Sequence, residues 1–354
     1  MMSGNQMKNC SITNYKHVLT ALSVVGMVLL FTNPLYGQWP FNKKHDNLPS
    51  EKLIPEKDWT KGQYQEFYIW REGILQKQMD DDDDPQLLRR QKAILNGNKI
   101  TAEIWNYGSI SSPGNKVTDI VWEGLGYGYE FGPFICAEVE VAPNSHLDAY
   151  IKTDENGNPV TNDDGDTVWV AKVISDGIVS LGGEVSPDGK EIWGWQPLAY
   201  NAEGVPYADP ASSYIPTSND LDRDGDGKPD SWPEEWYNEN IKEFVWPGAL
   251  RQGASNSDME SFFVVDDRTN KEFEYYPFPD DSTHKGLGIE IESRYYQWAN
   301  PLAEDIIFLI YKVTNKSDKD LNEVMFGMWG DPHVGGPSNW QDDLSYFDRD
   351  INMV

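Results

Sequence analysis

Residues 286–298 read GLGIEIESRYYQW, and residues 304–315 read EDIIFLIYKVTN. In the first stretch Leu287, Ile289 and Ile291 recur at every second position, so they share one face of a β-strand. The second stretch is apolar on both faces, which predicts a central strand that is buried on both sides. Because no helical pattern separates the two stretches, they predict neighbouring strands of an antiparallel protein.

Strand patterns of the same kind occur along most of the chain. They occupy residues 99–110, 119–142, 145–174, 260–267 and 322–331. The stretch at 119–142 looks like two strands around a glycine-rich bend, and the stretch at 145–174 looks like a long-looped hairpin. The fold class that we predict is mostly β: an antiparallel β-sandwich with long irregular loops and few short helices.

The composition agrees with this fold class. The 354-residue chain contains 30 glycines and 22 prolines, which supply turns, and 45 aromatic residues (14 Trp, 18 Tyr and 13 Phe), which favour strands. Residues 175–247 are irregular and rich in proline, glycine, tryptophan and aspartate. A chain of this length forms one large domain or two.

The N-terminal residues 1–37 look like a secretory signal peptide. Lys8 and Lys16 precede the apolar run Val18–Phe31, and small residues follow, with cleavage expected after Gly37. The alternative is a membrane anchor, but the run is short for a bilayer span of about 20 residues. We therefore expect secretion or cell-surface localisation, and no stable membrane insertion after cleavage.

The residues between the signal peptide and the sandwich form a separate segment. Residues 38–97 predict an extended, partly helical lead-in, with five consecutive acids in a loop at 80–84. A short helix is expected over Pro85–Leu95, capped by Asp84. The sandwich domain is expected at 98–354. Its last residues, DRDINMV, resemble the start of a further strand, so we expect either a truncated gene product or a fragment of a longer protein.

Net charge and cysteine content narrow the class of function. Removing residues 1–37 deletes two lysines and no acid, which leaves a net charge of about −31. Such a chain repels nucleic acid and anionic membranes and attracts cations. Cys136 is then the one remaining cysteine, so no internal disulfide forms. Its apolar neighbours predict a buried core residue rather than a reactive thiol.

The clearest chemical motif lies at 220–235, which we name the acid loop. Residues 220–237 read DLDRDGDGKPDSWPEEWY, with aspartates at alternate positions and Gly227 where a sharp turn is needed. Calcium takes six to eight oxygen ligands, and this spacing supplies them from one loop. The predicted ligands are Asp222, Asp224, Asp226, the backbone carbonyl of Lys228, Asp230 and Glu234. The alternative is a solvated acidic turn.

The acid loop departs from the EF-hand pattern. Pro233 stands where an EF-hand has its bidentate glutamate, and Glu234 follows one residue late. The DRDGDGKPD run resembles the calcium loops of thrombospondin type 3 repeats, over about a dozen residues and in one copy. Since no base or polarised water adjoins the predicted ligands, we expect calcium to be structural rather than catalytic.

A second acidic cluster lies at 329–348. It comprises Asp331, His333, Asp342, Asp343 and Asp348. These residues form either a second cation site or an acidic surface loop, and the sequence leaves both readings open.

Enzyme motifs are missing from the sequence. The histidines show no zinc-binding spacing, and there is no nucleophile elbow, P-loop or dinucleotide fingerprint. A group of tryptophans in the irregular region offers faces on which sugars stack, but core packing is the preferred explanation. These tryptophans are Trp193, Trp195, Trp232, Trp236 and Trp246.

Several segments together resemble a known family. They are WNYGSIS, WEGLGYGYEFG, DSWPEEWYN, VWPGALRQGASN, EYYPFPDDS and YKVTNKSDKDLNEVMFGMWGDPHVGG, spread from about Asn98 to Val354. The family consists of large secreted proteins of uncharacterised function from bacteria that use type IX secretion. The resemblance supplies no activity and no catalytic residues.

The sequence therefore predicts a secreted, calcium-binding structural or binding protein. Its expected partner is an extracellular polysaccharide or a cell-surface component. The alternatives are a secreted polysaccharide hydrolase and a carbohydrate-binding module without catalysis. Two carboxylates in a cleft beside exposed tryptophans would favour the hydrolase, and buried tryptophans would favour the structural protein.

Overall fold

A computed structural model describes residues 90–111, 120–178, 193–249, 253, 255–332, 334–335, 343–344, 346 and 348–349. All of them belong to the second of two compact units, which spans residues 71–354. The expected signal peptide (1–37) lies outside the described residues, as do the lead-in up to residue 89 and its five acids.

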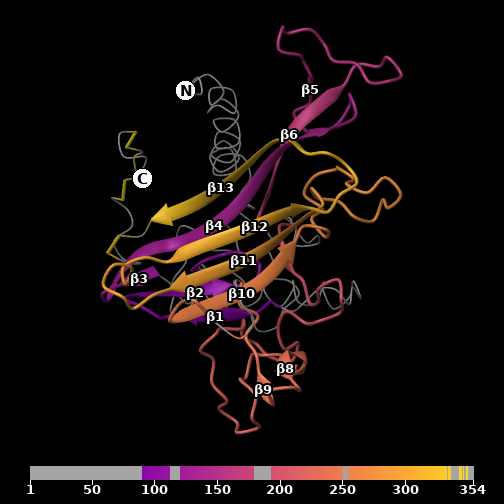
Figure 1. Ribbon diagram of the computed structural model, residues 1–354. Coiled ribbons are helices and arrows are strands. Elements are labelled where there is room, and N and C mark those ends of the chain that lie inside the picture. Colours follow the sequence, from indigo (N-terminus) through magenta and orange to yellow (C-terminus); the bar gives the residue numbers. More distant parts are fainter. Residues whose placement is uncertain are drawn as a thin grey trace, which may run out of the picture. The chain divides into compact units, whose positions relative to one another are not determined.

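The described part of the chain is almost entirely β (Figure 1). Its strands are β1 (Lys92–Leu95), β2 (Ile100–Trp105), β3 (Ile120–Trp122), β4 (Leu125–Glu140), β5 (Tyr150–Ile151), β6 (Trp169–Asp176), β7 (Gln196–Pro197), β8 (Tyr237–Asn238), β9 (Glu243–Phe244), β10 (Met259–Asp266), β11 (Ile289–Gln297), β12 (Phe308–Asn315) and β13 (Asn322–Pro332). One 3₁₀ turn, η2 (Glu234–Trp236), is the sole helical element among the described residues.

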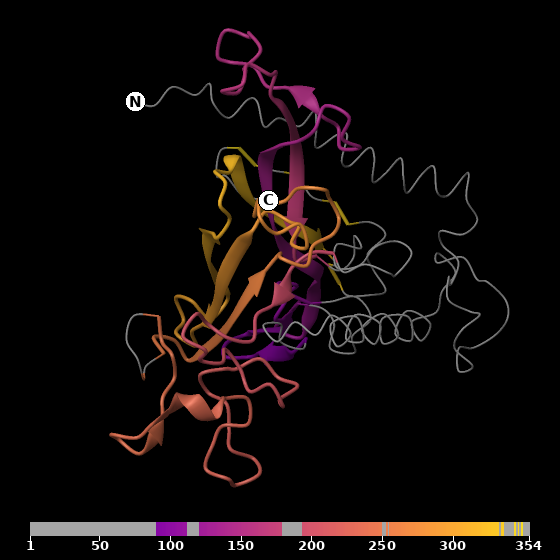
Figure 2. The same ribbon diagram turned by 90° about the vertical axis from the view of Figure 1, so that its right-hand side faces the viewer.

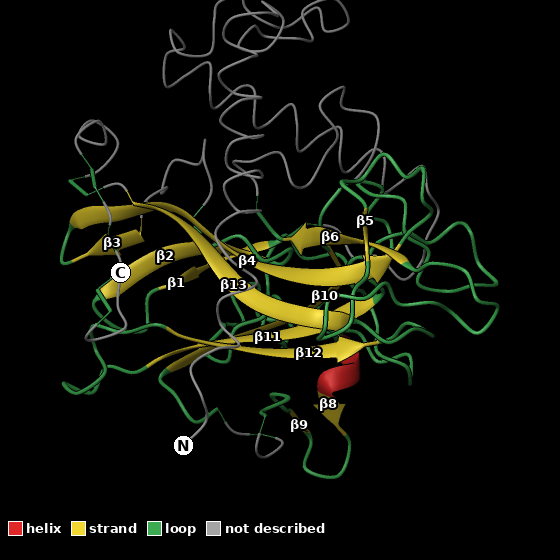
Figure 3. Ribbon diagram, turned by 90° about the horizontal axis from the view of Figure 1, so that it is seen from above, coloured by secondary structure: helices red, strands yellow, loops and turns green. Residues whose placement is uncertain are grey.

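The strands form two large antiparallel sheets. The first has the order β1-β2-β3-β4-β6-β5, and β13 pairs with the free edge of the long strand β4. The second has the order β12-β11-β10-β7, and β8 and β9 form a small separate ribbon. Figures 2 and 3 show the two large sheets as two layers, with β4 and β13 in one and β11 and β12 in the other. The predicted antiparallel β-sandwich is confirmed.

The core lies between the two layers. Ile104 and Ile135 from the first sheet are fully buried, as are Val265 and Ile291 from the second. The alternation predicted for residues 286–298 is also confirmed, since Leu287, Ile289 and Ile291 are at most 2% exposed. Full burial of one such side chain contributes about 1.5–3 kcal/mol.

The prediction that residues 304–315 form a central strand is wrong. Strand β12 is the edge of its sheet, and its exposed and half-buried residues alternate. Ile310 is 55% exposed, whereas Leu309 and Tyr311 pack against the core. Phe326 on the edge strand β13 contacts Tyr311, with ring centroids 5.1 Å apart. The apolar side chains of this stretch therefore lie at an edge of the second sheet and not at its centre.

The helix expected over Pro85–Leu95 is also wrong where the structure describes it. Residues Lys92–Leu95 form strand β1, which pairs with β2 so that Leu95 faces Ala102. Leu95 is fully buried, because alternation places Ala93 and Leu95 on the core side. Burial against the sheet overrides the local helix propensity. The first sheet thus begins at Lys92 and not at Asn98.

Two local expectations near β4 need correction. The bend between β3 and β4 lies at Glu123 and Gly124, and the glycine-rich stretch that follows it continues inside the 16-residue β4. Cys136 is half-buried rather than a core residue. It points to the outer face of β4, because its neighbours Ile135 and Ala137 point inward and are fully buried.

The hairpin expected at 145–174 is confirmed, since β5 pairs antiparallel with β6. Its long loop contains two tight turns of the same construction. In the first, Asp154 accepts the N–H groups of Asn156 and Asn158, and in the second Asn162 accepts those of Asp164 and Asp166. Side-chain acceptors of this kind hold a turn without help from distant residues.

A buried carboxylate joins the two sheets. Asp267, directly after β10, is fully buried and accepts four hydrogen bonds. Three come from the backbone N–H groups of Leu287, Gly288 and Ile289 at 2.6–3.0 Å, on the approach to β11. The fourth comes from the Ser175 hydroxyl of β6, at 2.9 Å. Burial raises the pKa of Asp267 to about 6, and the hydrogen bonds limit the rise.

Neighbouring groups hold this carboxylate in place. The indole Nε1 of Trp195 donates to the Ser175 hydroxyl at 3.0 Å, so the serine relays between tryptophan and carboxylate. Gly286 has φ +83° and lies against Asp267, where a Cβ would collide with its backbone and side chain. Glycine is therefore required at this position.

We expect Asp267→Ala to destabilise the fold by about 3–5 kcal/mol, because it leaves four buried donors without an acceptor. Urea unfolding followed by far-UV circular dichroism measures the loss. Asp280→Ala is the control, since Asp280 is exposed, and it should change stability by no more than about 0.5 kcal/mol. A loss below about 1 kcal/mol for Asp267→Ala would show that the carboxylate does not fasten the sheets.

Candidate metal site

The stem of the acid loop is held by side-chain and backbone hydrogen bonds. The Asp220 carboxylate accepts both the N–H and the hydroxyl of Ser231, at 2.9 and 2.5 Å. The N–H of Asp230 donates to the carbonyl of Leu221 at 3.1 Å. The two ends of the loop are therefore closed, and its tip projects into solvent.

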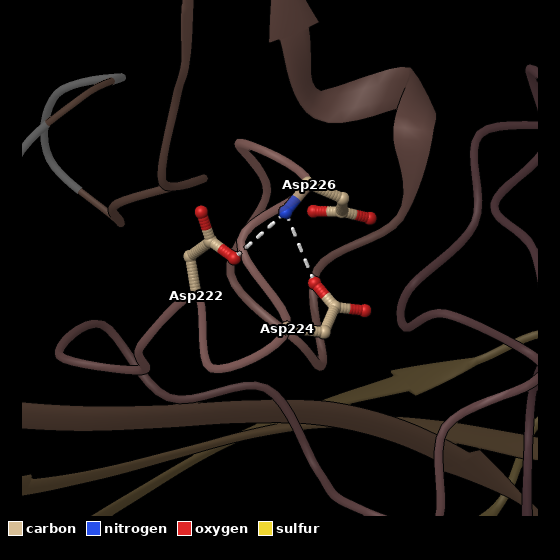
Figure 4. A group of neighbouring side chains, drawn as sticks. All are labelled: Asp222, Asp224 and Asp226. Atoms are coloured by element: carbon tan, nitrogen blue, oxygen red, sulfur yellow. Dashed lines mark hydrogen bonds between the residues drawn. The ribbon is translucent and has the colours of Figure 1, made fainter.

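At the tip, the loop folds around the Asp222 carboxylate. Asp222 accepts the backbone N–H groups of Gly225, Asp226 and Gly227 at 2.6–3.1 Å. The N–H of Asp226 also donates to Asp224, as Figure 4 shows. Gly225 and Gly227 have φ values of +82° and +95°, which side-chain-bearing residues rarely adopt. The two glycines thus let the loop curl tightly.

This curl brings three predicted ligands together. Carboxylate oxygens of Asp222, Asp224 and Asp226 lie within 4.8 Å of one another, and all three side chains are exposed (Figure 4). Within the part of the chain that the structure describes, no other group of three acids, histidines or cysteines comes this close. An all-oxygen donor set of this kind fits a hard cation such as calcium.

Two of the other predicted ligands, Asp230 and Glu234, are engaged in ion pairs. The Lys228 side chain pairs with Asp209 at 2.7 Å and with Glu234 at 3.3 Å. The Asp230 carboxylate pairs with the Arg223 guanidinium at 2.6 Å and accepts its backbone N–H. These contacts with Arg223 hold the pKa of Asp230 below its usual value. To coordinate a cation at the tip, Asp230 and Glu234 must leave these partners.

Sequence reasoning missed the role of Arg223. This cation bridges Asp220 at 3.0 Å and Asp230 at 2.6 Å, across the mouth of the loop. The signal was present, because an arginine stands between the aspartates, three residues after Asp220 and seven before Asp230. The predicted ligand pattern included the oxygen donors of the loop and gave Arg223 no role.

The second acidic cluster is described only in part. His333 and Asp342 lie outside the described residues. Asp343 accepts the backbone N–H of Val334 at 2.9 Å. The described members, Asp331, Asp343 and Asp348, do not form a group close enough to share one ion.

A cluster of buried tryptophans is formed by the end of the acid loop and the residues that follow it. Trp232, Trp236 and Trp246 contact one another with ring centroids 5.4–5.6 Å apart, and they pack on Phe262 and Val264 of β10. They are at most 8% exposed. Each indole N–H has an acceptor: Thr217 carbonyl for Trp232, Pro206 carbonyl for Trp236 and Glu260 carboxylate for Trp246.

Core packing therefore explains most of the tryptophans that sequence analysis grouped. Trp195 is also buried, at 1% exposure, in the main core. Trp193 is half-buried. A flat sugar-stacking strip of exposed tryptophans is not present among these five residues.

A further electrostatic feature is a pair of carboxyl groups near the end of β6. Burial raises the pKa of Asp176 to about 7, and the neighbouring Glu130 adds to the rise. Burial and the charge of Asp176 raise the pKa of Glu272 to about 8. One oxygen of Glu272 has no hydrogen-bond partner among the described residues. Both groups are therefore more easily protonated than ordinary acids.

No family model matches the chain, and no curated protein or solved structure is significantly similar to it.

We expect the acid pair to make stability fall as pH rises. The folded pKa values of Asp176 and Glu272 lie above the ordinary 3.8 and 4.5, so between about pH 4 and pH 8 the folded state binds more protons than the unfolded state. Stability is then lost as pH rises through the folded pKa values. Asp176→Asn removes one charge and should melt a few degrees above the unmodified protein at pH 8.

Thermal melts at pH 4, 6 and 8 test this expectation. Asp148→Asn provides the matched control, because Asp148 is exposed and its replacement should not alter the pH profile. An Asp176→Asn melting temperature that stays at or below that of the unmodified protein at pH 8 would contradict the assignment.

Proposed function

We propose that the protein is a secreted, calcium-binding structural or binding component of the extracellular space or cell surface. The observation that carries the proposal is the convergence of Asp222, Asp224 and Asp226 on a loop shaped by two glycines. Three carboxylates this close repel one another, and a divalent cation relieves the repulsion. Calcium is the cation that an oxygen donor set and a flexible loop favour.

The position of the acid loop supports a structural role for calcium. Ser231 donates two hydrogen bonds to the Asp220 carboxylate at the stem of the loop. The next residue, Trp232, belongs to the tryptophan cluster. Ordering the loop therefore also orders the segment that covers the outer face of β10. The three carboxylates have no neighbouring base among the predicted ligands, so the site offers binding rather than chemistry.

Sequence features support export and an extracellular partner. The proposed signal peptide, the strongly acidic composition and the resemblance to type IX secretion proteins point the same way. Among the described residues no helix has the length and apolar character needed to cross a bilayer. The acidic charge argues against nucleic acid, so the proposed partner is a polysaccharide or a cell-surface component.

Calcium should raise the melting temperature of the mature chain. A ligand at 100 times its Kd stabilises by about 2.7 kcal/mol, which is several degrees for a chain of this size. We expect such a rise with calcium relative to excess chelator, and its loss in Asp224→Ala. Asp164→Ala is the control, because Asp164 is an exposed aspartate in another glycine turn. If calcium leaves the melting temperature unchanged, the loop is a solvated turn.

The role of Asp230 as a ligand can be tested by removing its partner, Arg223. Arg223→Ala removes the guanidinium that holds the Asp230 carboxylate, so calcium should bind about three- to tenfold more tightly. Isothermal titration calorimetry measures the change in Kd. Lys242→Ala removes an equally exposed cation that is paired with Glu239, away from the loop, and should have no effect. Equal affinities in the two variants would exclude Asp230 from the ligand set.

A further inference from the structure

A cavity of about 350 Å³ lies at the end of the second sheet where β10 terminates, which the arrowhead of β10 marks in Figure 1. Its floor includes Asp266, the last residue of β10, and Glu290, near the start of β11. Its walls include Phe278 and His284 from the connection between these strands, and Lys316 from the segment after β12. The volume falls within the range of small-molecule sites.

Two residues that line the cavity, Asp266 and Glu290, belong to a row of polar residues across four strands. Asp266 is directly opposite Gln196 of β7 on one side and Glu290 of β11 on the other, and Glu290 is opposite Thr314 of β12. Residues that face each other across strands point to the same side of the sheet. The residue before Asp266 in β10, Val265, points into the core. Because neighbouring residues of a strand point to opposite faces, the polar row lies on the outer face of the sheet.

Each acidic side chain that lines the cavity has a basic side chain beside it. Arg268 donates to Asp266, His284 Nδ1 lies 2.7 Å from Asp281, and Lys316 Nζ lies 3.6 Å from Glu290. Three carboxylates and three basic side chains therefore surround one space. Burial also raises the pKa of Asp266 to about 7, despite the nearby guanidinium.

The rest of the wall is aromatic side chain and backbone. The rings of Phe278 and His284 meet edge to face, with centroids 6.1 Å apart. Gly288 has φ +73°, and a Cβ there would press on Pro277 and Ser317. The backbone at Gly288 and Ile289 thus borders the cavity without a bulky side chain at the glycine.

We propose that this cavity binds a neutral sugar residue of an extracellular polysaccharide. Sugar hydroxyls both donate and accept hydrogen bonds, and paired carboxylates and cations offer acceptors and donors side by side. The apolar face of a sugar ring fits the Phe278 ring. Because Arg268 and Lys316 each already face a carboxylate, the cavity offers no unpaired lysine or arginine to attract phosphate or a carboxylated ligand, and the acidic chain repels both.

The proposal stands apart from the calcium site, because none of its residues belongs to the acid loop. The experiment uses the mature chain on a glycan array that carries neutral, acidic and amino sugars, with calcium and with chelator. Inorganic phosphate is a competitor probe. The best-bound glycan is then titrated by calorimetry against Glu290→Gln and Phe278→Ala, with Asp224→Ala as the control outside the cavity.

We expect a neutral glycan to bind, with a Kd at least tenfold weaker in Glu290→Gln and in Phe278→Ala and unchanged in Asp224→Ala. Glu290 is partly exposed, so its replacement by glutamine should keep the fold, and thermal melts check each variant. The proposal is overturned if no glycan binds, if only anionic glycans bind, if phosphate displaces the glycan, or if both cavity variants retain full affinity. If calcium does not change the melting temperature of the unmodified chain while the glycan still binds, only the calcium site is overturned.

Discussion

The buried carboxylate of Asp267 is the constraint on which the arrangement of the sheets depends. A carboxylate without partners in an apolar core costs several kcal/mol, and here four hydrogen bonds from both sheets offset that cost. The same bonds fix where the chain enters β11 after β10. They therefore set the register that places Asp266 opposite Glu290 and forms the floor of the cavity.

The aspartates of the acid loop have two different kinds of partner. In the acid loop, Asp222 and Asp224 hold backbone N–H groups of the loop itself, whereas Asp220 and Asp230 hold Arg223. The same side chains that define the turn are thus the ones that gather negative charge at its tip. A loop of this kind combines a formed backbone with a site that favours a cation.

The sequence predicted part of the candidate site and not the rest. Alternate aspartates and well-placed glycines predict the gathering of Asp222, Asp224 and Asp226, because that geometry arises within six consecutive residues. The ion pairs of Asp230 and Glu234 depend on which cations lie nearby in space. The cavity could not be predicted at all, since its residues come from β10, from β11 and from the segments that follow β10 and β12, and only strand pairing brings them together.

By itself, the sequence determined that the protein is built of antiparallel strands, that Leu287, Ile289 and Ile291 face a core, and that the acid loop turns tightly. These properties follow from alternation and from glycine at φ values that other residues avoid, which neighbours along the chain decide. Tertiary structure alone decided that β12 is an edge and that Lys92–Leu95 is a strand. An apolar stretch buries itself against whatever surface reaches it, and that surface comes from residues far away in the sequence.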